Sequence, residues 1–365
     1  MINKKIQRYC IAIVILLVVG IIWQISQKVA SPFQTKLSTM EKIKVEELLN
    51  DLKTSCIGRY LIDLPSSYTA AEISRDRIND LTIITTRMYP PSFEQRISLR
   101  EKEIRSTKIV EQENMPYLKK IHSLPNGMKG VIFERGKGEI KPDAFRVFEA
   151  HMYDNGVAFE IESAFINASD KRYDLKREVN PDVYINNSEE KFAELTDLLL
   201  RIKGRTNNEI PTAPGTCIQN AFIADNGKDK EDINILFKDG NDKSQLRFGI
   251  STDNFTQEKD SLLERSNTIA ANILPSNGSI LRKGARKINQ LETEELLAIG
   301  DYSSSSNKRY DFILLTNEKI GGYKTPVFAL ELLNAEWTPS PYNLNEIISF
   351  WDAISQTVRL RPGAF

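Results

Sequence analysis

Two short segments of the chain begin in the same way. Residues 54–69 read TSCIGRYLIDLPSSYT, and residues 216–226 read TCIQNAFIADN. In each segment a Cys–Ile pair opens a short apolar run that leads into a turn, which is the pattern of a β-strand. The segments lie about 160 residues apart and hold both cysteines that follow residue 30. We therefore expect two domains that begin with equivalent strands.

The elements predicted after Cys56 form one complete unit. Ser188 is the expected N-cap of its last helix, and Gly204 is the expected end. The pattern predicts strands at 56–65, 81–89 and 129–136, a hairpin at 145–165 around Asp154–Asn155–Gly156, and helices at 92–108 and 188–204.

The predicted order recurs after Cys217. It ends on a helix with an apolar stripe, as the first unit does. The pattern predicts a strand at 217–224, a hairpin at 233–252, a helix from about Asn254 to Leu274, strands at 310–316 and 327–334, and a helix at 343–360.

Strands joined by hairpins, with helices packed beside them, predict two similar α+β domains with mostly antiparallel sheets. The N-terminal domain is expected at 34–204 and includes an amphipathic helix within 34–53. The C-terminal domain is expected at 217–365. Residues 205–216, RTNNEIPTAPGT, are rich in turn formers and predict a linker.

The first 30 residues are expected to lie outside this fold. Lys4, Lys5 and Arg8 precede an apolar run at 9–25 that is almost long enough to span a bilayer. Basic residues before such a run favour a cytoplasmic amino end. Cleavage after Ala30 would place Lys28 where a small residue is needed. We therefore predict an uncleaved signal anchor with the remaining chain exported, and a cleaved signal peptide is the alternative.

Export bears on the two cysteines. In an oxidising compartment Cys56 and Cys217 are expected to form a disulfide that joins the two domains. Closing a loop of about 160 residues would stabilise the fold by about 4–5 kcal/mol in chain-entropy models. The alternative is that both are buried, reduced thiols in the first strands.

The charge balance indicates no nucleic-acid partner. The chain holds 49 basic and 49 acidic residues, and residues 1–30 contribute basic side chains only. The exported part is therefore slightly acidic, without the basic excess that nucleic-acid binding requires. The basic segment 281–287 (LRKGARK) is expected to pair with the acidic segment 292–295 (ETEE).

The chain carries no motif that indicates an enzyme. The nucleophile elbow, the H-E-x-x-H zinc motif, the P-loop and the dinucleotide fingerprint are absent, and no C-x-x-C pair occurs. The two histidines, His122 and His151, are expected at the surface or on a sheet face. We therefore predict no catalytic residue, no cofactor and no metal site. Two joined domains form a cleft, which is the usual place for a binding site, and its contact residues stay unassigned.

Two segments resemble a known family. CIGRYLIDLP at 56–65 and RLRPGAF at 359–365 are similar to segments of the two-domain immunity proteins of the type VI secretion system. That family neutralises the fourth class of secreted lipase effectors. The resemblance covers 54–365, and we expect both segments to hold the fold instead of contacting the toxin.

The resemblance implies an inhibitor that binds a phospholipase effector in the periplasm and blocks lid opening or access of substrate. Residues 9–25 would anchor it in the inner membrane; after cleavage it would be soluble in the periplasm. The family supplies no cofactor and no catalytic residue. An envelope-anchored ligand-binding or structural protein with an interdomain cleft is the alternative, and an envelope enzyme of unrecognised type would need a catalytic carboxylate or histidine.

Overall fold

The computed structural model describes residues 36–71 and 74–365. The predicted anchor at 1–30, with its apolar run at 9–25, lies outside these residues. In the described part, no helix is long and apolar enough to span a membrane.

The first half consists of short antiparallel strands with a few helices. Its elements are α2 (Thr39–Leu48), β1 (Leu52–Ile57), β2 (Tyr60–Pro65), β3 (Tyr68–Ala70), β4 (Arg75–Ile78), β5 (Leu81–Arg87), α3 (Pro90–Ser106), β6 (Leu118–His122), β7 (Gly130–Gly136), β8 (Phe145–Asp154), β9 (Val157–Ile166), α4 (Asp174–Val179), α5 (Ser188–Arg201) and β10 (Ile202–Gly204).

The second half repeats this order. Both halves contain an opening hairpin, two strands, a helix, four strands, a long helix and a short closing strand. Its elements are β11 (Gly215–Ile218), β12 (Ala221–Ala224), β13 (Glu231–Asp239), β14 (Leu246–Asp253), α6 (Ser266–Ile273), β15 (Ser279–Ile288), β16 (Leu291–Asp301), β17 (Lys308–Thr316), β18 (Val327–Asn334), α7 (Leu344–Ser355) and β19 (Arg359–Leu360). The prediction of two similar, sheet-rich α+β halves with antiparallel sheets is confirmed.

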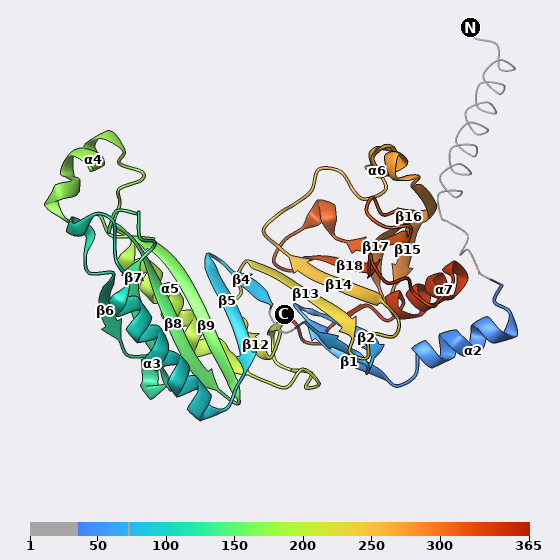
Figure 1. Ribbon diagram of the computed structural model, residues 1–365, viewed down its shortest axis with the longest axis horizontal. Coiled ribbons are helices and arrows are strands. Elements are labelled where there is room, and N and C mark those ends of the chain that lie inside the picture. Colours follow the sequence, from blue (N-terminus) through green and yellow to red (C-terminus); the bar gives the residue numbers. More distant parts are fainter. Residues whose placement is uncertain (1–35, 72–73) are drawn as a thin grey trace, which may run out of the picture.

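One antiparallel sheet runs through both halves. Its order is β15-β16-β17-β18-β14-β13-β4-β5-β9-β8-β7-β6, and β3 also pairs with β13. At its centre β4 and β13 are antiparallel, with Ile78 opposite Glu231 and Arg77 opposite Asp232. Outward from this pair, equivalent strands follow in the same order on both sides. We call strands β4, β5, β9, β8, β7 and β6 with helices α3, α4 and α5 the first lobe (Figure 1). Strands β13, β14, β18, β17, β16 and β15 with helices α6 and α7 form the second lobe.

Each half completes the opening hairpin of the other. The C-terminal strand β19 pairs with β2, and β10 at the end of the first half pairs with β12. Helix α2 packs against α7, so residues 39–65 lie with the second lobe. The expected boundaries near 204 and 217 therefore divide the sequence into two repeats. In space the repeats are intertwined, because each one contributes a strand to the opening hairpin of the other.

The long helices cover the sheet through their apolar stripes. Helix α7 begins with a capping box, in which Asn343 Oδ1 accepts from the Glu346 amide (3.0 Å) and Glu346 Oε2 accepts from the Asn343 amide (2.8 Å). Full burial of one aliphatic side chain contributes roughly 1.5–3 kcal/mol. The buried stripes join one apolar cluster that spans both lobes and comprise Leu195, Leu198 and Leu199 of α5 and Ile347, Trp351 and Ile354 of α7.

The two Cys–Ile segments are hairpins, and the prediction of a single strand in each was wrong. Gly58 and Asn220 lie in the two tight turns and have positive φ angles of 56° and 59°. A Cβ atom on Gly58 would lie 2.2 Å from Cγ2 of Thr252, so glycine is required there for space as well as for conformation. The chain therefore reverses after Ile57.

Several helix ends also differ from prediction. Asn187, and not Ser188, is the N-cap of α5, and the helix ends at Arg201 because Ile202–Gly204 form β10. Helix α6 covers only Ser266–Ile273 of the expected span, and α7 ends at Ser355.

Strands β15 and β16 were missed because their charged residues hide the alternation of a strand. They carry the basic and acidic segments at 281–287 and 292–295. Lys287 Nζ lies 3.1 Å from Glu292 Oε1, and Arg282 Nε lies 2.8 Å from Glu295 Oε2. The expected pairing of these two segments is confirmed.

Candidate functional site

The structure places Cys56 and Cys217 in a disulfide between the two opening hairpins, with Cα atoms 5.8 Å apart. Gly58 and Cys217 also exchange two backbone hydrogen bonds of 2.8 Å each. Both cysteines are buried. The two similar segments therefore meet at the junction of the lobes.

A buried arginine crosses this junction. Arg59 Nε donates to Glu231 Oε1 (2.6 Å), Nη2 donates to Asp225 Oδ1 (3.0 Å), and Nη1 donates to the Ala364 carbonyl (2.6 Å). Its guanidinium also lies 4.6 Å from the centre of the Phe365 ring. Burial raises the pKa of Glu231 even though Arg59 opposes this shift. Removing either partner of a charge pair this deeply buried would leave an uncompensated charge in the core and destabilise the fold.

A second arginine holds the C-terminal segment against residues 205–216. Arg361 donates to the carbonyls of Pro211 (2.7 Å), Ala213 (2.9 Å) and Gly215 (2.6 Å). The expected linker is thus packed into the junction. The segment 56–65 around Arg59 is largely buried, and in the segment 359–365 Arg361 and Ala364 are buried, so both segments hold the fold.

Neither histidine is arranged for catalysis. His122 Nε2 lies 3.1 Å from Glu134 Oε2, and His151 Nε2 lies 2.8 Å from Glu149 Oε1. Burial opposes ionisation of Glu149, but hydrogen bonds from Arg100 and His151 and the charge of Arg135 hold its pKa well below its usual range. Among the described residues, no hydroxyl or thiol nucleophile is hydrogen-bonded to either ring, and no group of side chains suits a metal ion.

A small hollow of about 260 Å³ lies beside the first hairpin. Its wall includes Lys53, Ser55 and Tyr68 near the first hairpin, Asn208 before β11, and Phe237 on β13. Sites for drug-sized ligands usually have about 300–1,000 Å³. The hollow is too small to enclose a partner protein, which would have to bind over a wider surface.

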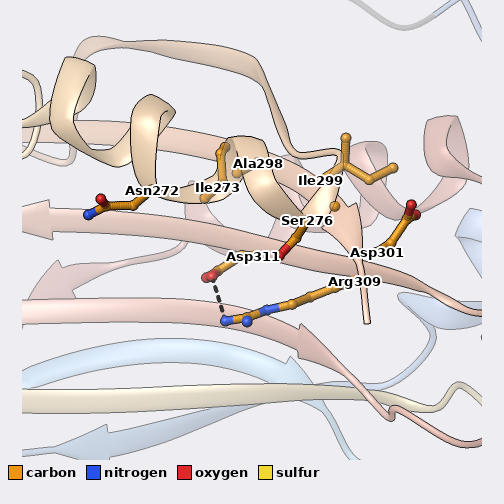
Figure 2. A pocket seen from close by; sticks show the side chains of 9 residues that line it. Asn272, Ile273, Ser276, Ala298, Ile299, Asp301, Arg309 and Asp311 are labelled. Atoms are coloured by element: carbon orange, nitrogen blue, oxygen red, sulfur yellow. Dashed lines mark hydrogen bonds and ion pairs between the residues drawn. The ribbon is translucent and has the colours of Figure 1, made fainter. Parts of the chain in front are cut away.

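A second hollow, of about 110 Å³, lies at the end of the second lobe (Figure 2). Ile273 and Ser276 face the ends of β16 and β17, where Arg309 forms an ion pair with Asp311 at 3.1 Å. The hollow adjoins the polar loop at 302–307. Its size suits water or one side chain of a partner, and no chemistry follows from its lining.

The arginines of the junction were not singled out from the sequence. Arg59 pairs with Glu231 across 172 residues, and no local pattern indicates such a contact. The only available signal was the position of Arg59 and Arg361 inside the two segments that carry the family resemblance.

Comparison with known proteins identifies the family. The N-terminal domain model of Tle cognate immunity protein 4 matches residues 53–205, and its C-terminal domain model matches residues 209–363. No curated protein sequence matches the chain.

Three solved structures share the fold. The apo structure of immunity protein TplEi of the type VI secretion system from Pseudomonas aeruginosa has 21% identity, covers 86% of this chain and 99% of its own, and gives a TM-score of 0.67. A structure of a Tle4–Tli4 complex has 20% identity, covers 85% of this chain and 98% of its own, and gives a TM-score of 0.67. TplEi in complex with an "L" peptide has 20% identity, covers 86% of this chain and 99% of its own, and gives a TM-score of 0.62. Since both halves are matched by the paired family models, the chain belongs to the Tle cognate immunity protein 4 family, whose members are two-domain inhibitors and not enzymes.

Proposed function

We propose that this protein protects its cell by binding a phospholipase effector of the type VI secretion system in the periplasm and blocking lid opening or access of substrate. The observation that carries the proposal is the tandem match of both family domains over residues 53–205 and 209–363. A relative with the same fold was solved in a complex named Tle4–Tli4.

The geometry of the junction supports binding by a preformed surface. The two halves share the β4–β13 pair, complete each other's opening hairpins with their closing strands and are linked by a disulfide. Buried Arg59 adds three hydrogen bonds across the same region. A surface that is already ordered loses little conformational entropy on binding, so more of the contact energy appears as affinity.

Neutralising a lethal enzyme requires tight binding. A nanomolar Kd corresponds to about 12 kcal/mol, and stable protein complexes usually bury roughly 1,200–2,000 Å² in total. The hollow of about 260 Å³ beside the first hairpin is far too small for this. The proposed contact therefore extends over the outer surface of one or both lobes.

The proposed location is the periplasmic side of the inner membrane, with residues 9–25 as an uncleaved anchor. The cationic start of the chain supports this orientation. The Cys56–Cys217 pair suits an oxidising compartment. Tethering would raise the local concentration of the inhibitor beside the lipids that the effector attacks.

Protection of cells tests the proposal. The full chain is co-expressed with a type VI phospholipase directed to the periplasm, and survival is compared with that of cells making the chain without residues 1–30, which remains in the cytoplasm. Survival is expected only with the full chain. Purified protein should also inhibit hydrolysis of phospholipid vesicles at about equal molar amounts. Absence of protection from every effector of this class, together with absence of a complex in pull-down, would refute the proposal.

A further inference from the structure

Equivalent loops form one end of each lobe. In the first lobe they are 107–117, 137–144 and 167–187, and we call this end the first tip. In the second lobe they are 274–278, 302–307 and 335–343, which form the second tip. Helix α4 of the first tip and helix α6, which leads into the second tip, lie on the same side of the molecule in Figure 1.

The first tip contains an insertion relative to the repeat. The segment between the last sheet strand and the long helix runs from 167 to 187 in the first half and includes α4. In the second half the equivalent segment runs only from 335 to 343. This extra chain has no counterpart in the scaffold that the two halves share.

Polar and aromatic groups hold the insertion firmly to the lobe. Tyr173 stacks on Tyr184 with ring centres 5.7 Å apart, and Lys176 Nζ lies 5.6 Å from the centre of each ring. Tyr173 donates to Asp143 Oδ1 (2.5 Å), and Arg172 donates to the Glu113 carbonyl (2.7 Å). The insertion is thus anchored to the two neighbouring loops of the first tip.

Several other apolar side chains of the same tip are exposed to solvent. Leu175 and Val179 are 75% and 76% exposed and lie four residues apart on α4, which puts them on one helix face. Val183 follows in the same segment and is also exposed. Ile140 on the loop 137–144 is 74% exposed, and Val110 on the loop 107–117 is 68% exposed. The Val110 amide donates to the Glu139 carbonyl (3.0 Å), which holds these two loops side by side. The segment is therefore fixed by its polar contacts and by the buried cluster around Ala168 and Tyr173, while the exposed apolar side chains remain free to make contacts.

Charge and area indicate what covers this surface. Residues 167–187 contain four basic and four acidic side chains, so the insertion does not attract an anionic bilayer. Burying one side chain of this size removes roughly 60–120 Å² of apolar surface, so the partly exposed apolar side chains of the tip supply at most roughly 400 Å². Of the roughly 800 Å² per partner that a stable interface buries, a little over half, about 450 Å², is apolar. Two copies meeting tip to tip would have to bury all of these side chains completely, whereas a larger partner that also reaches the second tip, where Trp337 is 71% exposed, gains further apolar area.

We propose that the first tip, centred on Leu175 and Val179, docks an apolar surface segment of the effector protein. The inference rests on the proposed function and assigns its contact to a particular end of the molecule. Trp337 at the second tip is the expected second anchor, since exposed tryptophans often dominate binding energy.

The test compares binding of the full chain and of Leu175→Asp/Val179→Asp to the phospholipase recovered in the pull-down, with its nucleophilic serine replaced by alanine. The expected result is a Kd at least about 100-fold weaker for the double variant, because two desolvated apolar contacts are lost. The control is Leu99→Asp, which places one aspartate at an exposed leucine of α3 outside the tip and should leave the Kd within about threefold. Thermal unfolding of each variant shows that the fold is intact.

The outcomes separate this inference from the proposed function. Binding by the wild type that is unchanged in the double variant overturns the inference and leaves the function intact. Loss of binding with Trp337→Ala while the double variant binds like the wild type also overturns it, because the contact then lies only at the second tip. Binding of the wild type to phosphatidylethanolamine–phosphatidylglycerol vesicles, or a dimer, that the double variant abolishes would overturn it in favour of a membrane or a second copy. Failure of the wild type to bind any effector refutes the function itself.

Discussion

Breaking the disulfide should lower the free energy of unfolding by about 5 kcal/mol. Cys56 and Cys217 are 161 residues apart in the sequence, so the bond closes a loop of nearly half the chain. In a chain-entropy treatment, a loop of this length restricts the unfolded ensemble by about 5 kcal/mol at 25 °C. The folded state should change little, because both hairpins are held by strand pairs and by Arg59.

Urea unfolding of oxidised and reduced wild type isolates this term, since both forms keep the two sulfur atoms in the core. Reduction must be carried out on unfolded protein because both cysteines are buried. The variant Cys56→Ala/Cys217→Ala is the control for packing and should be slightly less stable than the reduced wild type. Mass spectrometry should find the oxidised form lighter by two hydrogens.

The reasoning fails if reduction changes the free energy of unfolding by less than about 1 kcal/mol. That result would mean that the junction contacts already restrict the unfolded chain or that the bond strains the folded one. A mass unchanged by reduction would show that the bond does not form in the purified protein.

Three further substitutions test other parts of the structure. Burial raises the pKa of Asp76 to about 7 in the folded protein, so the folded protein keeps a proton that the unfolded chain loses, and stability falls as pH rises from about 4 through 7. Asp76→Asn should remove up to roughly 4 kcal/mol of this fall in the free energy of unfolding between pH 4 and pH 8. Urea unfolding measures it, and equal pH profiles of the two proteins would contradict the reasoning. Arg59→Met should lower the free energy of unfolding by about 3–5 kcal/mol, because it leaves buried Glu231 without its charged partner. The double variant Arg59→Met/Glu231→Gln should recover part of this loss, and no recovery would contradict the pairing. Gly58→Ala should cost more than the roughly 1–2 kcal/mol of a left-handed residue, because its Cβ would meet Thr252, and Thr252→Ser should relieve the excess if the clash is real.

Local patterns in the sequence were enough to predict many of the elements. The apolar stripes of α5 and α7 and the Asn155–Gly156 turn between β8 and β9 depend on residues only a few positions apart. The repeated Cys–Ile segments also indicated the duplication and the positions of the two cysteines. These features depend on short-range periodicity and turn conformation, which a single sequence displays directly.

The arrangement of these elements was decided only in three dimensions. Pairing of β4 with β13, pairing of β19 with β2, and the Arg59–Glu231 contact all join residues far apart along the chain. The same holds for the first tip, where three loops bring exposed apolar side chains to one end of a lobe. Strand partners and buried ion pairs are selected by packing and desolvation of the whole fold, which have no periodic trace in the sequence.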